Sequence, residues 1–456
     1  MAKNMPPLGK DFTVVGKLEA WLEEHRNWKS EQNRALSTLG DQVFNEGYGA
    51  SAYGPYLASA NGCRVNDFGG NSFLDTAMAG GSAILGHANQ VTNDAIIDQL
   101  KRGTLYTAPN FNTHTVADKA LEFLPWFDKT VFCSSGSEAT MRAIRIARAH
   151  TGRKKIAIFS GGWHGAHDQV LIEEDYTGAE EAPLAITKGK GILPVLLDHL
   201  VLLPYNHRAA FDLIKHHADD LAMVFIEPAQ GSNPREDIGL FLNELRQVTS
   251  DEGVLLGFDE IITGFRLDPG GGQEHFAVHA DIATYGKSLG GGLPIGMIAG
   301  TDQVMSAVRD EPVFMGGTFS ANPLSMASAL ATLQQLRPEI YSSLNRNGNR
   351  LNSEINEFCT NNAIPAHMTG VGSMQRLVFA APPVASRRQR DFVEIPLSSQ
   401  SDFYAAMLMN GVHIAGNRIN FLSSAHDEPE ISTLVRAYTD VLSACQEAGI
   451  FDRAAL

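Results

Sequence analysis

The chain has 456 residues, of which 44% are hydrophobic and 19% charged, and its formal net charge is −15. This length exceeds a single typical core and predicts two or more domains, and the composition is that of an ordinary soluble globular protein. The acidic balance argues against nucleic acid or an anionic membrane as the main partner, because both require a basic surface.

The cysteines and the start of the chain give no sign of a secreted or membrane protein. Cys63, Cys133, Cys359 and Cys445 are far apart and form no CxxC pair. We therefore expect reduced thiols, with neither a disulfide framework nor a metal site. Residues 1–30 lack a basic start followed by an apolar stretch, and no run reaches the roughly 18 apolar residues of a membrane span. A cytoplasmic protein without a membrane partner is expected.

The first elements along the chain are strand-like pieces around Gly62–Phe68. From about residue 128 to 300, short apolar runs alternate with helical patterns such as Ala209–His217 and Phe241–Asp251. Most of these runs lack polar alternation, as expected of strands covered on both faces, so the order predicts an α/β domain with a mainly parallel sheet. The strand candidates are Lys155–Phe159, Leu200–Pro204, Ala222–Ile226, Val254–Phe258, Ile282–Tyr285 and Ile295–Ala299.

The chain changes character from about residue 330, where a smaller α+β domain is predicted. Pro382-Pro383 and Arg387–Arg390 are predicted to form an exposed loop. The expected division is 1–70 for an N-terminal arm and part of the small domain, 71–330 for the large domain, and 331–456 for the C-terminal small domain. The expected elements after 330 are helices at Leu344–Thr360, Ser401–Asn410 and Glu428–Ala448, and strands near Ser373–Val378 and Arg418–Leu422.

A glycine-containing turn opens a predicted helix at Ser134–Ala139. Ser135 and Glu138 fit a capping box, in which two side chains satisfy N–H groups at the helix start. The remaining N–H groups and the positive end of the helix dipole form a ready phosphate site. The same residues also fit an ordinary helix cap without a ligand.

Polar or aromatic side chains follow two of the predicted strands. Trp163 and His164 lie in a glycine-rich turn after Lys155–Phe159, and Glu227 follows Ala222–Ile226. Trp163 could stack on a planar ring, His164 could contact a cofactor or assist proton transfer, and Glu227 could reach a cofactor oxygen. Each of the three could equally have a purely structural role.

Asp259 and Lys287 form the most informative pair. Asp259 closes a strongly apolar run, and Lys287 stands after Ile282–Tyr285 and before the glycines of Ser288–Pro294. Ligands of parallel sheets bind beyond the carboxyl ends of the strands. A lysine and an acid there suit pyridoxal 5′-phosphate (PLP), because the lysine forms a Schiff base and the acid keeps the pyridine nitrogen protonated. The pair predicts a PLP-dependent enzyme.

Two later residues are further candidates. Thr318, in the small-residue loop Gly316–Pro323, could donate its hydroxyl and N–H groups to a phosphate, or the loop could be a tight turn with a helix cap. Arg418 could clamp a substrate carboxylate with two hydrogen bonds, or it could be a surface residue.

Together these segments resemble the class III (subgroup II) aminotransferases of PLP fold type I, from about Gly62 to His426. The resemblance is closest to glutamate-1-semialdehyde aminomutase and to the aminotransferase domains of polyketide and peptide synthetase assembly lines. It implies a large PLP-binding domain with a mainly parallel sheet and a smaller α+β domain. The matching pieces are Ser134–Ala139, Trp163–Gly165, Glu227-Pro228, Phe258–Arg266, Tyr285–Gly292, Gly317–Pro323 and Phe421–His426.

The resemblance also implies roles for single residues. Lys287 would be the Schiff-base lysine and the proton shuttle. Asp259 would bind the pyridine nitrogen, with Ile261 packed under the ring and Trp163 stacked on it. Thr318 would complete the phosphate site of the neighbouring subunit, so a homodimer is implied. The residues that would hold the phosphate within one subunit are Ser135, Gly136 and Ser137.

Two departures distinguish this chain from the aminomutases. Those enzymes carry an arginine in a Ser-Pro-Val-Arg-like stretch, whereas Gly49–Tyr56 contains none. They also carry a glutamate close to the Phe-Leu-Ser segment, whereas this chain has a shorter loop with Arg418. We therefore expect amino transfer from an amino acid such as glutamate or alanine, whose carboxylate Arg418 would clamp. The acceptor would be an aldehyde, a ketone or a β-keto acyl group, free or carrier-bound, in a biosynthetic pathway of secondary metabolism.

Three other hypotheses compete with this one. A glutamate-1-semialdehyde-like 2,1-aminomutase would run both half-reactions on one substrate without a second donor. A nucleotide-binding protein such as a dehydrogenase would need a GxGxxG turn, and Gly290–Gly292 lack that spacing. A catalytically silent PLP-fold scaffold would require the loss of Lys287 or Asp259, and both are present.

Overall fold

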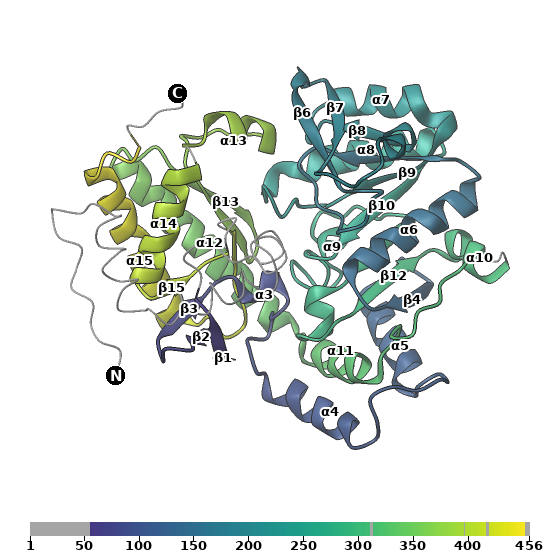
Figure 1. Cartoon of the computed structure of the whole chain (residues 1–456), viewed down its shortest axis with the longest axis horizontal. Coiled ribbons are helices and arrows are strands. Elements are labelled where there is room, and N and C mark those ends of the chain that lie inside the picture. Colours follow the sequence, from purple (N-terminus) through teal and green to yellow (C-terminus); the bar gives the residue numbers. More distant parts are fainter. Residues whose placement is uncertain (1–54, 311–312, 396, 416–418, 452–456) are drawn as a thin grey trace.

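The computed structural model describes residues 55–310, 313–395, 397–415 and 419–451. They form two parts that lie side by side (Figure 1). The larger part is built on a seven-stranded sheet with helices on both faces, and the smaller part combines two short sheets with long helices. The expected division at residues 70 and 330 stays a prediction.

The large sheet confirms the expected α/β class with a mainly parallel sheet. Every neighbouring pair in it is parallel except those of β12, which runs antiparallel to both β4 and β11. The strand order is β4 (Lys129–Cys133), β12 (Gly296–Gly300), β11 (Ile282–Tyr285), β10 (Leu255–Glu260), β9 (Leu221–Ile226), β5 (Lys155–Phe159) and β8 (Leu200–Leu203).

The central strands are apolar without alternation because helices cover both faces of the sheet. In β5, Ile156 and Ile158 belong to the core with α6 (Gly136–Thr151), whereas Ala157 and Phe159 belong to the core with α7 (Ala209–His217) and α8 (Gly239–Asp251). The carboxyl ends of β4, β5, β9, β10 and β11 therefore meet at one edge of the sheet, where a ligand can bind.

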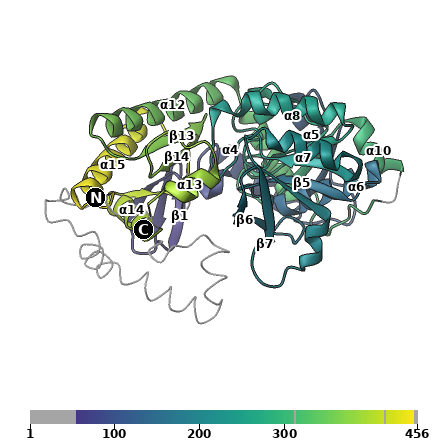
Figure 2. The same cartoon turned by 90° about the horizontal axis from the view of Figure 1, so that it is seen from above.

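Further elements surround this sheet. The hairpin of β6 and β7 projects toward the smaller part (Figure 2). The additional elements of the larger part are α4 (Gln90–Leu100), α5 (Asn112–Phe123), β6 (Ile172–Ala179), β7 (Ala182–Thr187), η2 (Pro194–His199), η3 (Ala218–Asp220), η4 (Glu236–Ile238), α9 (Gly272–His275), η5 (Lys287–Gly290), α10 (Asp302–Asp310) and α11 (Pro323–Gln335).

The smaller part contains two sheets. One has the order β1 (Leu57–Asn61), β2 (Arg64–Asp67), β3 (Ser72–Asp75), β15 (Val412–His413), and the other has the order β13 (His367–Val371), β14 (Met374–Val378), β16 (Ile419–Phe421). β15 pairs in parallel with β3, which joins the beginning of the described chain to its end. The helices are α3 (Met78–Gly81), α12 (Pro338–Asn361), α13 (Arg387–Val393), α14 (Leu397–Met409) and α15 (Glu428–Glu447).

The prediction of an exposed loop at Arg387–Arg390 is wrong. These residues open α13, whose N-terminal N–H of Gln389 is capped by the Ser386 hydroxyl. Arg390 is buried, and Arg388 pairs with Glu174 of the β6–β7 hairpin and donates to the Gly178 carbonyl at 2.6 Å. Arg388 is therefore a partner for acceptors on another element, which a local charge pattern does not reveal.

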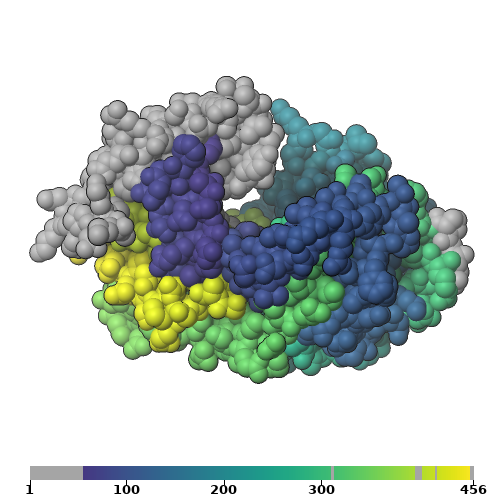
Figure 3. Space-filling model, turned by 90° about the horizontal axis from the view of Figure 1, so that it is seen from below, coloured from purple at the N-terminus to yellow at the C-terminus, as the bar shows by residue number. Residues whose placement is uncertain are grey.

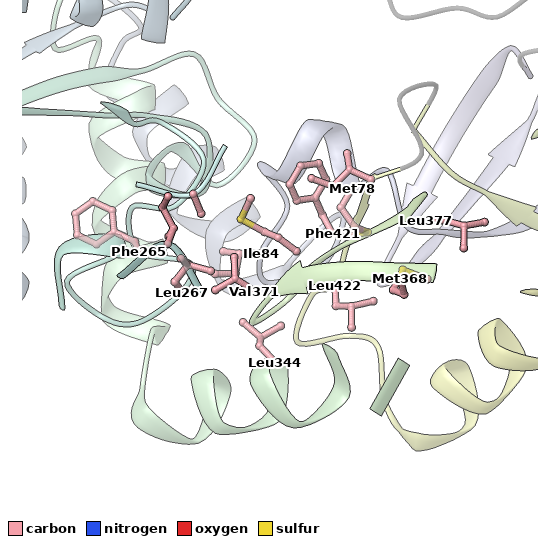
Figure 4. Packing of buried hydrophobic residues seen from close by; sticks show 14 of the residues in the cluster. Met78, Ile84, Phe265, Leu267, Leu344, Met368, Val371, Leu377, Phe421 and Leu422 are labelled. Carbon is pink, nitrogen blue, oxygen red and sulfur yellow. The ribbon is translucent and has the colours of Figure 1, made fainter. Parts of the chain in front are cut away.

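One hydrophobic core runs through both parts of the molecule. Figure 4 shows Leu267 of the large part close to Ile84 and Val371, with Met78 next to Phe421. Because these side chains are almost fully buried, the two parts pack as one body at this junction. No helix in the described ranges has the length and hydropathy needed to span a bilayer.

Candidate active site

A cavity of about 440 Å³ opens at the edge where the parallel strands end. Its volume lies within the range of small-molecule sites, about 300–1,000 Å³. Most of the predicted site residues line it together. The lining residues are Ala79, Ser82, Ser134, Ser135, Gly136, Ser137, Thr140, Trp163, His164, Gly165, Glu227, Asp259, Ile261, Ile262, Lys287, Gly292, Leu293, Pro294 and Ile295.

The first turn of α6 forms one end of the cavity. Ser135 is the N-cap, and its hydroxyl oxygen accepts from the Glu138 N–H group at 3.2 Å. The Glu138 carboxylate accepts from the Ser134 N–H group at 2.6 Å, so it reaches one residue further back than in a simple capping box. The N–H groups of Gly136 and Ser137, at the first two helical positions, have no intrahelical acceptor and favour an anion.

Asp259 is held in place on β10 by a histidine. Its Oδ2 lies 2.8 Å from His164 Nδ1, and its Oδ1 accepts from the Ile261 N–H group at 3.1 Å. The ring of His164 packs against Phe225, and both members of the ion pair are almost fully buried. The carboxylate therefore has a fixed orientation toward the cavity, and His164 supports it from behind.

Lys287 follows β11 directly and has a left-handed backbone with φ of 41°. Such a conformation is strained for a residue with a side chain and is typical of functional positions. Burial lowers the pKa of Lys287 to about 8, opposed by Glu227 and Asp259 and assisted by Arg266. The neutral fraction of this amine near neutral pH is therefore much larger than for an ordinary lysine, and a neutral amine is a nucleophile and a base.

Glu227, which follows β9, is hydrogen-bonded to the turn that contains Trp163. Its carboxylate accepts from the N–H groups of Trp163 at 3.0 Å and Gly231 at 3.2 Å. Burial raises the pKa of Glu227 to about 7, although His164 and the two N–H groups oppose this. The Trp163 ring is half exposed at the cavity, with Lys188 Nζ 5.2 Å from its centroid.

Among the described residues, one predicted site residue does not line this cavity. Thr318 is exposed and belongs to a turn outside the cavity. Its loop is held by Arg142, which donates to the Gly316 carbonyl at 3.1 Å and pairs with Glu138. Arg418 and the Gly49–Gly54 stretch lie outside the described residues.

The sequence does not predict that Ala79 and Ser82 form part of the cavity wall. These residues belong to the run Met78-Ala79-Gly80-Gly81-Ser82, in which four successive residues have positive φ. A run of small residues with two adjacent glycines is a signal for irregular backbone. Nothing in the local sequence tells which site such a loop reaches.

The residues present fit PLP. A Cβ on Gly136 would lie 3.0 Å from Ile261, and one on Gly165 would lie 2.7 Å from the Ser137 hydroxyl, so small residues leave room for the backbone cradle next to α6. The helix N-terminus suits the phosphate, Asp259 suits the ring nitrogen, and Lys287 suits the aldehyde. His164 supports this assignment through its hydrogen bond to Asp259, which fixes the carboxylate that would meet the ring nitrogen.

Comparisons with known proteins agree with this geometry. The family model of the class III aminotransferases matches residues 49–423. A glutamate-1-semialdehyde 2,1-aminomutase of Methanosarcina acetivorans is 37% identical over 393 residues, covering 85% of this chain and 91% of that protein.

Two solved structures also superpose closely. A transaminase with PLP bound has a TM-score of 0.82 and 27% identity, covering 92% of this chain and 97% of that one. A β-phenylalanine aminotransferase from Variovorax paradoxus has a TM-score of 0.85 and 25% identity, covering 96% of this chain and 98% of that one. The chain therefore belongs to the PLP-dependent class III aminotransferases, with the fold type I architecture.

Proposed function

We propose that the protein is a biosynthetic aminotransferase of the cytoplasm. It moves an amino group from an amino acid to an aldehyde, a ketone or a β-keto acyl group, free or carrier-bound. The observation that carries this proposal is that no arginine lines the cavity within the described ranges. Beyond the clamp proposed for the donor, an acceptor recognised through a carboxylate of its own would need a further fixed cation, and the bidentate guanidinium is the usual choice.

Two further facts support this choice of acceptor. The stretch Gly49–Tyr56, where the aminomutases carry their arginine, contains none in this sequence. The similar enzyme of Variovorax paradoxus is named for a β-amino acid, whose amino group is one carbon further from the carboxylate. Arg418 is proposed as the clamp for the donor carboxylate, in the loop between β15 and β16.

The site residues divide the work of the reaction. When bound, PLP supplies a ring that accepts electrons from the carbon carrying the amino group. Lys287 would hold this group covalently through Nζ, and the same Nζ would serve as the base that moves a proton at the reacting carbon. Asp259, oriented by His164, keeps a proton on the ring nitrogen. The first turn of α6 fixes the phosphate through Ser135, Gly136 and Ser137.

Trp163, Ile261 and Glu227 are assigned to shaping the ring site. Trp163 and Ile261 both line the cavity, where Trp163 would stack on the ring and Ile261 would pack under it. Glu227 fixes the Trp163 backbone at 3.0 Å and reaches a ring oxygen, for which a carboxyl with a pKa near 7 is a suitable hydrogen-bond partner. These roles are tested by the loss of PLP affinity in single variants.

The active unit is proposed to be a homodimer, with Thr318 completing the phosphate site of the partner. Large apolar side chains are exposed on and near α4 and α5, with exposed fractions of 54% for Val91, 50% for Leu100 and 80% for Phe111. Figure 3 shows that the blue segment around residue 100 lies across the face seen from below. Several exposed large apolar side chains on neighbouring stretches of the chain suit a subunit interface.

A glutamate-1-semialdehyde-like 2,1-aminomutase is the second candidate. The observation in its favour is the 37% identity to a protein of that name. Such an enzyme would isomerise one substrate without a separate donor. The lack of an arginine at Gly49–Tyr56 argues against it.

The experiment that tests both candidates is a titration of the PLP-loaded protein with single amino acids in the absence of an acceptor. Loss of the visible absorbance band with L-glutamate or L-alanine would support the aminotransferase and identify its donor. A band that no amino acid removes, together with isomerisation of glutamate 1-semialdehyde without a donor, would support the aminomutase. A protein that stays colourless after PLP is added would contradict both.

A further inference from the structure

A buried carboxylate outside the cavity closes a loop that forms part of the cavity wall. Asp75, at the end of β3, accepts from His87 Nε2 at 2.7 Å and His413 Nδ1 at 2.8 Å. The same carboxylate accepts from the N–H groups of Ala77 at 2.9 Å and Met78 at 3.1 Å. Each oxygen thus receives one histidine and one backbone donor, and the Asp75 side chain is only 2% exposed.

Asp75 and His87 are the two ends of the loop 76–86, which we call the stapled loop. The backbone of His87 also pairs with Gly62 on both sides, so this end of the loop is fixed to the turn between β1 and β2. The other end is fixed by β15, because His413 stands opposite Asp75 in the parallel register. The carboxylate therefore joins three separate segments of the chain at the neck of the stapled loop.

The stapled loop has a strained backbone, although hydrogen bonds such as that from the Ala83 N–H group to the Met78 carbonyl at 3.2 Å lie within it. Met78 and Ala79 have φ of 42° and 51°, which costs about 1 kcal/mol or more for residues with a side chain. A Cβ on Gly81 would lie 3.1 Å from the Phe421 ring, so the loop is also pressed closely against β16. Figure 4 shows Met78 beside Phe421, and Ile84 at the junction of the two parts. Contacts outside the loop therefore help to offset this strain and to maintain its conformation.

The Gly81 carbonyl of the stapled loop connects the loop to Ser288, the residue that follows Lys287. The Gly81 carbonyl accepts from Arg266 Nη2 at 2.5 Å and from the Ser288 hydroxyl at 3.3 Å. Arg266 also bonds to the Leu422 carbonyl at 2.9 Å and is one of the groups that lower the pKa of Lys287. Ala79 and Ser82 of the same loop line the cavity.

We propose that Asp75 is a positioning residue for the reaction at Lys287. With His87 and His413 it fixes the stapled loop in its left-handed form, and the Gly81 carbonyl then sets the positions of Ser288 and Arg266 next to the lysine. The proposal rests on the proposed role of Lys287. An aspartate is required because its two oxygens accept from four donors, whereas an asparagine would direct its own N–H groups at two of them.

The first test is amide hydrogen exchange of the apoprotein, which needs neither substrate nor PLP. In Asp75→Asn, the amides of 77–83 should exchange about 10-fold faster, the effect of losing one charge-assisted hydrogen bond. The amides of 77–83 should exchange more slowly in His87→Gln, which keeps a hydrogen-bond donor at this position, than in His87→Ala, which removes it. The matched control is Asp67→Asn on β2, another buried strand-end carboxylate, which accepts from the N–H and side-chain amide groups of Asn71.

The second test is a pH titration of the visible absorbance of the PLP-loaded protein. Because the stapled loop positions Arg266 and Ser288, Asp75→Asn should move the midpoint of this titration, and Asp67→Asn should leave it unchanged. Wild-type exchange at 77–83 in both Asp75→Asn and His87→Ala, or uniform acceleration in every strand, would overturn the proposal. An unmoved midpoint despite faster exchange would reduce Asp75 to a purely structural role and so also contradict it. Failure of the proposed function would instead appear as a wild-type protein that forms no absorbance band, with the exchange results unaffected.

Discussion

Residues that carry the chemistry are concentrated immediately after strands that run in the same direction. Ser135, His164, Glu227, Asp259 and Lys287 stand at or just beyond the ends of β4, β5, β9, β10 and β11. Hydrogen bonds within the sheet hold the backbone of each strand at that edge, so each side chain enters the cavity from a fixed position. This rigidity is what proton transfer at a single carbon requires.

Lys287 is the residue on which the first prediction depends. In Lys287→Ala, multiple turnover should fall by roughly 10⁴-fold or more, since the covalent attachment and the proton transfer are both lost. The control is Lys101→Ala, which removes an exposed lysine paired with Asp98 on the surface. Steady-state kinetics with the donor found by titration would measure this. Normal turnover in Lys287→Ala would refute the assignment.

The pH dependence of Lys287 follows from its depressed pKa, which burial lowers to about 8. The neutral amine attacks the aldehyde, and its fraction grows as pH rises through 8. The rate at which the apoprotein captures PLP should therefore rise with pH from 6 and level off above about 8.5. A capture rate that continues to rise toward pH 10.5, the ordinary value for lysine, would show that burial does not act on this amine.

Single-residue roles could be predicted from the sequence where local context is sufficient. Asp259 and Lys287 were found because an acid and a lysine each closed an apolar run. The bond between His164 and Asp259 spans 95 positions, and that between Asp75 and His413 spans 338, so no local pattern reveals either. The structure also places Thr318 outside the cavity of its own chain, and its predicted role in the partner's site stays a prediction.

At the level of elements, α6 links stability to cofactor binding. Its N-cap Ser135 accepts from the Glu138 N–H group and at the same time lines the cavity. α13 has the same kind of cap, in which Ser386 accepts from the Gln389 N–H group at 3.2 Å away from the cavity. The two caps therefore form a natural pair of variant and control.

Ser135→Ala and Ser386→Ala should each reduce the free energy of unfolding by about 1 kcal/mol. Only Ser135→Ala should also weaken PLP binding, by roughly 5-fold or more, because one phosphate partner is lost. Chemical denaturation of the apoproteins and PLP titration would measure the two effects. Equal PLP affinity in both variants would remove Ser135 from the phosphate site.

The elements whose bounds the sequence predicts correctly belong to the large sheet or pack directly against it. β5, β11 and α7 have the predicted bounds, because continuous apolar runs and amphipathic helices are strong local signals. The β6–β7 hairpin was missed because it is half exposed and carries polar residues such as Glu173, Glu174 and Asp175. α13 differs from the predicted loop because Arg388 pairs with Glu174 of the distant β6, in addition to the ion pairs of Arg387 and Arg390 with Asp391 in the same helix.

At the level of the whole molecule, the apolar face around α4 and α5 leads to a prediction about assembly. Phe111→Asp should weaken the homodimer by about 2 kcal/mol or more, since exposed aromatic side chains are frequent hot spots of interfaces. The matched control is Leu240→Asp on α8, because Leu240 is 82% exposed and Phe111 is 80% exposed. Sedimentation velocity would measure both. A wild-type protein that sediments as a monomer would contradict the homodimer and the shared role of Thr318.

The parallel pairing of β3 with β15 has a consequence for the folding of the chain during its synthesis on the ribosome. Asp75 and His413 are 338 positions apart, and translation at about 5–20 residues per second needs roughly 20–70 s to connect them. During that interval the edge of β3 opposite β2 has no partner strand, and Asp75 lacks the second of its two histidines. The wall of the cavity next to Lys287 is therefore completed only after nearly the whole chain has been synthesised, so a ribosome that stalls before residue 413 leaves a nascent chain in which that wall is unfinished.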